Sequence, residues 1–69
     1  MFEPGDLVKI KDDYDKERIN AHLVSEHGYL WLVMHTKDSF IYCKSLATGD
    51  DLDGRGWLWF DQELEKADV

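Results

Sequence analysis

The side chains of this chain that most readily do chemistry are three histidines and one cysteine, namely His22, His27, His35 and Cys43. Structural zinc sites use four ligands, of which two or more are usually cysteines. Two ligands on one face of a helix stand four residues apart, whereas His22 and His27 stand five apart. The single cysteine supplies no closed site of this kind, and we expect neither a metal nor another cofactor.

Nucleophilic catalysis needs a nucleophile, a base and a group that orients the base. Cys43 and His35 fall on the two arms of one predicted hairpin, which would allow them to approach each other. The sequence contains no oxyanion-hole motif, and a chain of 69 residues has little room for a pocket that excludes water. Free cysteines are among the most buried residues. We therefore expect Cys43 to be a small core residue and the protein not to be an enzyme.

A run of acids at Asp50, Asp51 and Asp53 resembles part of a calcium-binding loop. An EF-hand requires an acid at its first position and a glutamate at its twelfth. These two positions hold Gly49 and Phe60 here. The sequence therefore predicts a solvated acidic turn rather than a calcium site.

The charge balance of the 69 residues is acidic, with 15 Asp and Glu against 8 Lys and Arg and a formal net charge of −7. Nucleic-acid binding depends on basic side chains that displace counterions from phosphates. No basic stripe is visible, so the sequence disfavours direct binding of nucleic acid. An acidic surface fits a basic protein surface, and it also serves solubility alone.

Apolar run length and cysteine usage indicate where the protein works. The longest uncharged apolar run, Tyr29–Met34, is far shorter than the roughly 20 residues of a membrane helix. The first residues lack the basic and apolar regions of a signal peptide. A lone cysteine forms no disulfide within the chain and suits a reducing compartment. We therefore expect a cytoplasmic protein that does not enter a membrane.

Short apolar runs bounded by turn residues predict strands rather than long helices. Both faces of the second of these runs are apolar, which is typical of a central or bent strand. The polar residues Thr36–Ser39 join it to the third run as a hairpin. Residues 47–56 form a loop with three glycines and three aspartates. The four expected strands are Leu7–Lys11, Tyr29–His35, Phe40–Leu46 and Trp57–Phe60.

Two further segments carry helical signals. Residues 12–28 form either a long loop or a short helix, with Asp15 as a candidate N-terminal cap and Gly28 where a C-terminal cap would stand. At the other end of the chain, Asp61–Lys66 predicts one helical turn whose Leu64 reaches back to the core.

Three segments resemble parts of SH3-like small barrels. Pro4–Ile10 is similar to their opening strand, Tyr42–Gly49 to a middle strand with its turn, and Trp59-Phe60 followed by Glu63-Leu64-Glu65 to their last strand and terminal turn. The resemblance implies a single, mainly β domain over residues 1–69, built as an antiparallel barrel of four to five strands. Residues 12–28 would be an insertion after the first strand. Stand-alone barrels of this kind are often accessory proteins of bacteria and of their phages.

Aromatic residues are numerous for so small a core, with three each of Trp, Tyr and Phe. Trp57 and Trp59 share one face of their strand, whereas Leu58 falls on the other face. At least one aromatic side chain should therefore be partly exposed. The rings expected to fill the barrel are those of Trp31, Phe40, Trp59 and Phe60.

The pattern predicts a protein-binding module that acts as an accessory or regulatory factor. SH3-like domains bind proline-rich peptides through an exposed aromatic groove flanked by acids, although the usual motifs of that groove are missing here. An alternative function is an acidic mimic of nucleic acid that inhibits a host nucleic-acid-binding enzyme. Self-association through the surplus aromatics is a third option. The predicted binding residues are Tyr14, Trp57, Arg55, Asp50, Asp51 and Asp53.

Overall fold

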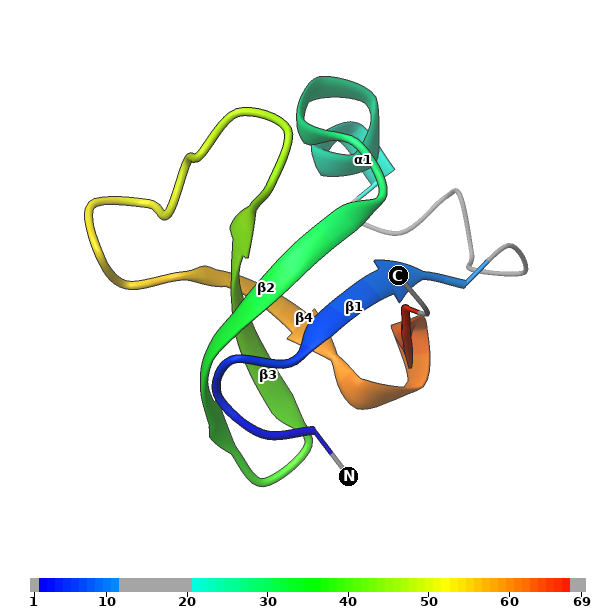
Figure 1. Ribbon diagram of the computed structural model, residues 1–69, viewed down its shortest axis with the longest axis vertical. Coiled ribbons are helices and arrows are strands. Elements are labelled where there is room, and N and C mark those ends of the chain that lie inside the picture. Colours follow the sequence, from blue (N-terminus) through cyan, green and yellow to red (C-terminus); the bar gives the residue numbers. More distant parts are fainter. Residues whose placement is uncertain (1, 12–20, 68–69) are drawn as a thin grey trace.

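The computed structural model describes residues 2–11 and 21–67, and within them the chain forms mainly β structure (Figure 1). The strands are short and a helix stands between the first two. A 3₁₀ turn separates the last two. The elements in chain order are β1 (Leu7–Ile10), α1 (Ala21–His27), β2 (Leu30–Lys37), β3 (Phe40–Ser45), β4 (Trp57–Phe60), η1 (Asp61–Glu63) and β5 (Leu64–Lys66).

All five strands belong to one antiparallel sheet with the order β4-β3-β2-β1-β5. The sheet is open, because β4 and β5 form its two edges. It is also strongly bent, since the molecule measures 26 × 25 × 24 Å, whereas a single flat sheet would be much thinner in one direction. The predicted mainly β, antiparallel architecture is confirmed.

The hydrophobic core lies on the inner face of the bent sheet, where two tryptophans dominate. Trp31 and Trp59 are both 0% exposed, and their rings meet edge to face with centroids 5.2 Å apart. Phe40 and Phe60 were expected in this core but lie on the opposite, outer face of the sheet. That expectation was wrong because they occupy the same strand parity as the exposed Leu58. The core residues are Val8, Ile10, Val24, Trp31, Val33, Ile41, Cys43, Trp59 and Leu64.

The β2–β3 hairpin is longer than its sequence suggested. Lys37 pairs with Phe40 across the hairpin, so the turn has only two central residues, Asp38 and Ser39. Asp38 has a φ of 56°, the left-handed conformation that tight hairpin turns require and that aspartate tolerates. The predicted four-residue turn at 36–39 was therefore wrong by two residues, which extend β2.

The segment before β2 contains the short helix rather than only a loop. Helix α1 ends at His27, and Gly28 follows with a φ of +83° while its N–H donates to the Val24 carbonyl at 2.8 Å. This is the left-handed C-terminal cap that the glycine predicted. The candidate cap Asp15 and the candidate binding residue Tyr14 lie outside the described residues.

The C-terminal segment departs from its prediction as well. The helical turn spans only Asp61–Glu63, and Leu64–Lys66 is a fifth strand rather than part of the turn. This strand pairs with β1, where Lys9 and Glu65 are register partners and their side chains form an ion pair at 3.3 Å. A strand of three residues carries almost no local signal, so only its partner reveals it.

Candidate functional site

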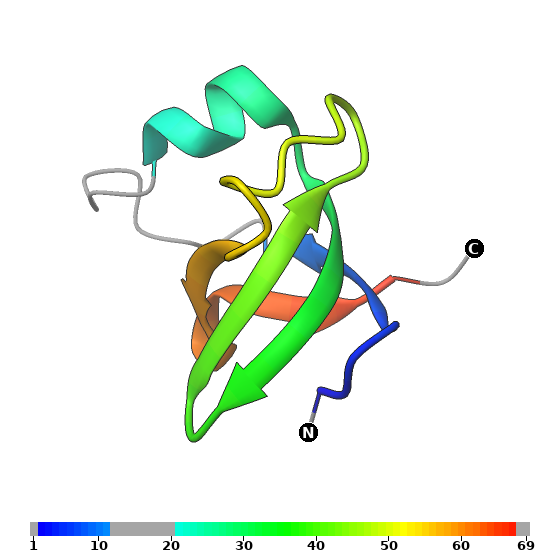
Figure 2. The ribbon, with the colours of Figure 1, turned by 90° about the vertical axis from the view of Figure 1, so that its left-hand side faces the viewer.

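The two ends of the sheet differ in what covers them (Figure 2). At one end, α1 lies beside the loop of residues 46–56, whereas the β2–β3 turn projects at the other end. At the first of these ends, His27 links α1 to the 46–56 loop and to β3. Its Nδ1 is 3.0 Å from the Thr48 hydroxyl, and Ser45 donates its hydroxyl to the His27 carbonyl at 2.8 Å. The sequence offered no signal for this role beyond the position of His27 next to the capping glycine.

Trp57, one of the predicted binding residues, lies at this end of the sheet, next to His27. It is half-buried and packs against the core, and the ring of His27 lies on it with centroids 5.6 Å apart. Its indole Nε1 is buried and makes no hydrogen bond. Trp57 and Trp59 do share the inner face as predicted, and Trp59 is fully buried whereas Trp57 is half-buried.

Two of the predicted acidic residues shape their own loop. One Oδ atom of Asp50 accepts the Leu52 N–H at 2.9 Å, and the other is 3.8 Å from Nε2 of His27. Asp51 accepts the Gly54 N–H at 3.1 Å. These contacts are the side-chain-to-backbone bonds by which aspartates stabilise turns. Asp50 and Asp51 therefore each use one carboxylate oxygen to stabilise the loop.

The remaining predicted residues, Asp53 and Arg55, are exposed on the same loop. The carbonyl of Arg55 is 3.0 Å from Nε2 of His35, which donates to it. The His35 ring stacks in turn on Tyr42, with centroids 4.4 Å apart and planes 14° from parallel. The backbone of Arg55 is therefore linked through His35 to Tyr42 of β3.

Tyr42 belongs to an apolar cluster on the outer face of the β3–β4 pair. Two cross-strand pairs build it, Phe40 with Phe60 and Tyr42 with Leu58. The Phe40 and Phe60 rings are 5.6 Å apart, and cross-strand neighbours of this kind contact each other directly. Phe40 is 36% exposed and Leu58 is 37% exposed, so the cluster faces solvent. We call Phe40, Tyr42, Leu58 and Phe60 the outer patch.

The outer patch was missed in the sequence although a signal for it existed. Lys44 shares its strand parity with Tyr42 and Phe40, and Ile41 and Cys43 occupy the other parity. A lysine rarely points into a core. Its position therefore indicated which face of β3 is outside, and this would have removed Phe40 from the core.

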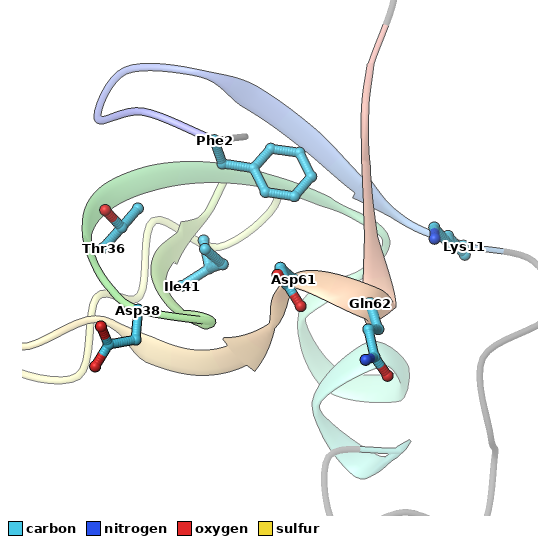
Figure 3. A pocket seen from close by; sticks show the side chains of 7 residues that line it. All are labelled: Phe2, Lys11, Thr36, Asp38, Ile41, Asp61 and Gln62. Carbon is cyan, nitrogen blue, oxygen red and sulfur yellow. The ribbon is translucent and has the colours of Figure 1, made fainter.

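A separate groove opens at the end of the sheet opposite α1 (Figure 3). It has a volume of about 710 Å³, and the side chains of Phe2 and Ile41 face each other across it. Its polar lining, among the residues that the structure describes, mixes one ammonium, one hydroxyl, two carboxylates and an amide, with no thiol or imidazole. The lining residues are Phe2, Lys11, Thr36, Asp38, Ile41, Asp61 and Gln62.

Cys43 and His35 do not form a catalytic pair. The Cys43 side chain is 0% exposed in the core, whereas His35 stacks on Tyr42 on the outer face. Burial raises the pKa of the Cys43 thiol from 9.0 to about 12, so the nucleophilic thiolate is not formed near neutral pH. Across residues 2–11 and 21–67, no three His, Cys, Asp or Glu side chains gather closely enough to hold a metal ion.

Comparison with known proteins adds no relative to this picture. No family model matches the chain. No curated protein and no solved structure matches it either. Within the described part of the chain, neither helical segment has the length and apolar character that crossing a membrane requires.

Proposed function

We propose that this chain is an SH3-like domain that binds another protein, as an accessory or regulatory factor of the cytoplasm. The fold part of the proposal is supported by the strand order. The first strand lies between the second and the fifth, a long connection joins β1 to β2, and a 3₁₀ turn stands between β4 and β5. The opening, middle and closing segments that resemble SH3-like barrels fall on β1, β3 and the β4–β5 end of this sheet.

The outer patch carries the functional part. Single exposed apolar side chains are ordinary, but here two cross-strand pairs join the exposed Phe40 and Leu58 to the half-buried Tyr42 and Phe60 on one sheet face. Binding surfaces of proteins concentrate their energy in a few aromatic and aliphatic side chains at the centre of an interface. The patch replaces Trp57 and Tyr14 as the proposed centre, and Arg55 is retained from the predicted binding residues.

A binding role without catalysis fits the chemistry of the described residues. The thiol is buried and protonated, and it lies in the core, away from the described lining of the groove in Figure 3. Two histidines contribute to packing. His27 joins α1 to the 46–56 loop, and His35 joins the backbone of Arg55 to Tyr42.

The proposed function is tested by capture with matched variants. A tagged wild-type chain and the double variant Phe40→Ser/Leu58→Ser are incubated with nuclease-treated bacterial lysate, and bound proteins are compared quantitatively. We expect a protein that the wild type retains at moderate salt and the double variant loses. Leu46→Ser is the matched control, because Leu46 is 46% exposed but lies in the turn after β3, outside the patch.

Retention of the same proteins by the wild type and the double variant would contradict the proposal. Circular dichroism of each variant checks that the sheet is intact. Loss of capture with Leu46→Ser and not with the double variant would move the binding surface to the α1 end of the sheet.

A further inference from the structure

The basic residues of the sheet fall into two groups with different partners. Lys9 pairs with Glu65 at 3.3 Å, and Lys66 lies 3.7 Å from Asp6, so the cations of the β1–β5 edge are neutralised within the molecule. The other group surrounds the outer patch and makes no ion pair in the part of the chain that the structure describes. It consists of Lys37, Lys44 and Arg55.

The register places this second group around the apolar cluster. Lys37 is the cross-strand partner of Phe40, so the two share a face. Lys44 follows Tyr42 by two residues on β3 and therefore shares its face as well. Arg55 is attached through its carbonyl to the imidazole that stacks on Tyr42. Two lysines thus share the face of one apolar centre, and the backbone of the exposed Arg55 lies beside it, in a chain of net charge −7.

The acids nearest to the patch in sequence are Asp38 and Asp61, and Asp61 also lines a small hollow together with Phe60 of the patch. Asp38 and Asp61 adjoin Lys37 and Phe60 in the chain, and both line the groove shown in Figure 3. Asp53 is exposed two residues before Arg55 and pairs with no cation in the described structure. On the strand face that carries the outer patch, the charged side chains of β2, β3 and β4 are Lys37 and Lys44, and both are basic.

We infer that the outer patch takes an acidic protein segment, in which an aromatic or aliphatic anchor is flanked by Asp or Glu. The inference rests on the proposed function and names the class of partner. The anchor packs on Leu58 and Phe40, and the flanking carboxylates face Lys37, Lys44 and Arg55. Complementary charge at the rim of an apolar centre speeds encounter and sets specificity.

The geometry of the rings favours a protein segment over a nucleic-acid strand. Bases stack on aromatic faces that are open. One face of Tyr42 is already covered by His35, and the Phe40 and Phe60 rings tilt against each other at 52°. What remains exposed is ring edge and the Leu58 side chain, which suit an inserted side chain better than a flat base.

A displayed library of short random peptides tests the inference without knowledge of the natural partner. The wild-type chain is the bait, and Phe40→Ser/Leu58→Ser is used for counter-selection. We expect the enriched peptides to carry an aromatic or aliphatic residue with Asp or Glu on both sides. The strongest peptide is then synthesised, together with a version in which each acid is replaced by its amide, and both dissociation constants are measured by fluorescence anisotropy.

Charge-reversed variants then locate the contact. Lys37→Glu, Lys44→Glu and Arg55→Glu should each weaken the acidic peptide by roughly threefold to tenfold, and added salt should reduce the difference. Lys11→Glu makes the same charge change in the groove and should alter the dissociation constant by less than about twofold. The amide peptide should bind all these variants about equally.

The possible results test the acidic class of partner and the protein-binding function separately. Patch-dependent peptides with basic or proline-rich flanks would overturn the acidic partner and leave the protein-binding function standing. An absence of patch-dependent peptides would overturn both. If a thymidine oligonucleotide bound the patch more tightly than the acidic peptide, the partner would be single-stranded nucleic acid instead. If the wild type sedimented as a dimer and Leu58→Ser as a monomer, the partner would be a second copy of the chain.

Discussion

The inner and outer faces of the β3–β4 pair carry similar side chains in different surroundings. On the inner face, Trp59 is 0% exposed and meets Trp31 edge to face at 5.2 Å. On the outer face, Phe40 meets Phe60 at 5.6 Å but stays 36% exposed. The inner rings are enclosed because the bent sheet and α1 close over them, whereas Phe40 stays exposed and Phe60 half-buried on the opposite face. Aromatic content alone therefore does not separate a core from a binding surface.

Among the substitutions that test the difference between the two faces, Trp59→Ala should lower the free energy of unfolding most. Truncation of a buried aromatic side chain costs about 3–5 kcal/mol, which is as much as the whole stability that a core of this size usually supplies. We expect the variant to be unfolded in water at 25 °C, as measured by circular dichroism and by urea titration of the wild type. Phe40→Ala is the matched change on the outer face and should cost about 1 kcal/mol. Equal decreases in the free energy of unfolding for the two variants would show that the two faces contribute equally to stability.

A smaller effect is expected where the 46–56 loop approaches β3. Gly56 has a φ of +86°, and a Cβ built there would lie 2.8 Å from the Cβ of Tyr42. Gly56→Ala should therefore lower the free energy of unfolding by about 2 kcal/mol, from backbone strain and from the displacement of Tyr42. The outer patch should be disturbed with it.

Gly54 supplies the control for this prediction. It has the same φ of +86°, but a Cβ there would meet nothing within 4 Å. Gly54→Ala should cost about 1 kcal/mol, the backbone term alone. The difference between the two variants in urea titrations measures the close contact with Tyr42, and identical losses would mean that the loop does not press on β3.

The inner face also makes stability depend on alkaline pH. Burial raises the Cys43 pKa from 9.0 to about 12, so the folded chain keeps a proton that the unfolded chain releases above pH 9. The unfolded state then binds fewer protons, and stability falls as the pH rises through this window. We expect about 1 kcal/mol less stability at pH 10 than at pH 8 from this group, measured as the difference between wild type and Cys43→Ala. Parallel pH profiles would contradict it.

The strands of the sheet were predictable to the extent that local pattern determines them. The alternation in Trp57–Phe60 correctly placed both tryptophans on one face, and Gly28 correctly predicted the end of a helix. Strand β5 was not predictable in this way, because Leu64–Lys66 becomes a strand only through its pairing with β1.

The candidate site was less predictable than the fold. Phe40 and Phe60 were assigned to the core because aromatic residues usually fill it, and Trp57 was predicted to bind a partner because at least one aromatic side chain had to be partly exposed. The bent sheet encloses the face of β4 that carries Trp57 and Trp59, leaves Trp57 half-buried, and places Phe40 on the open face. Such curvature arises from the whole sheet and is not encoded in any single strand.

Leu58→Ser should change stability least, and it tests most directly whether the outer face is a binding surface. Leu58 is 37% exposed on the outer patch, so Leu58→Ser should change the free energy of unfolding by no more than about 0.5 kcal/mol. If the patch is the binding surface, the same substitution should weaken partner binding at least about tenfold, because it removes the aliphatic side chain at the centre. Asp53→Asn is the counterpart on the acidic loop and should leave binding unchanged. If this neutralisation abolished binding and Leu58→Ser did not, the acidic loop would be the functional surface, as nucleic-acid mimicry predicts.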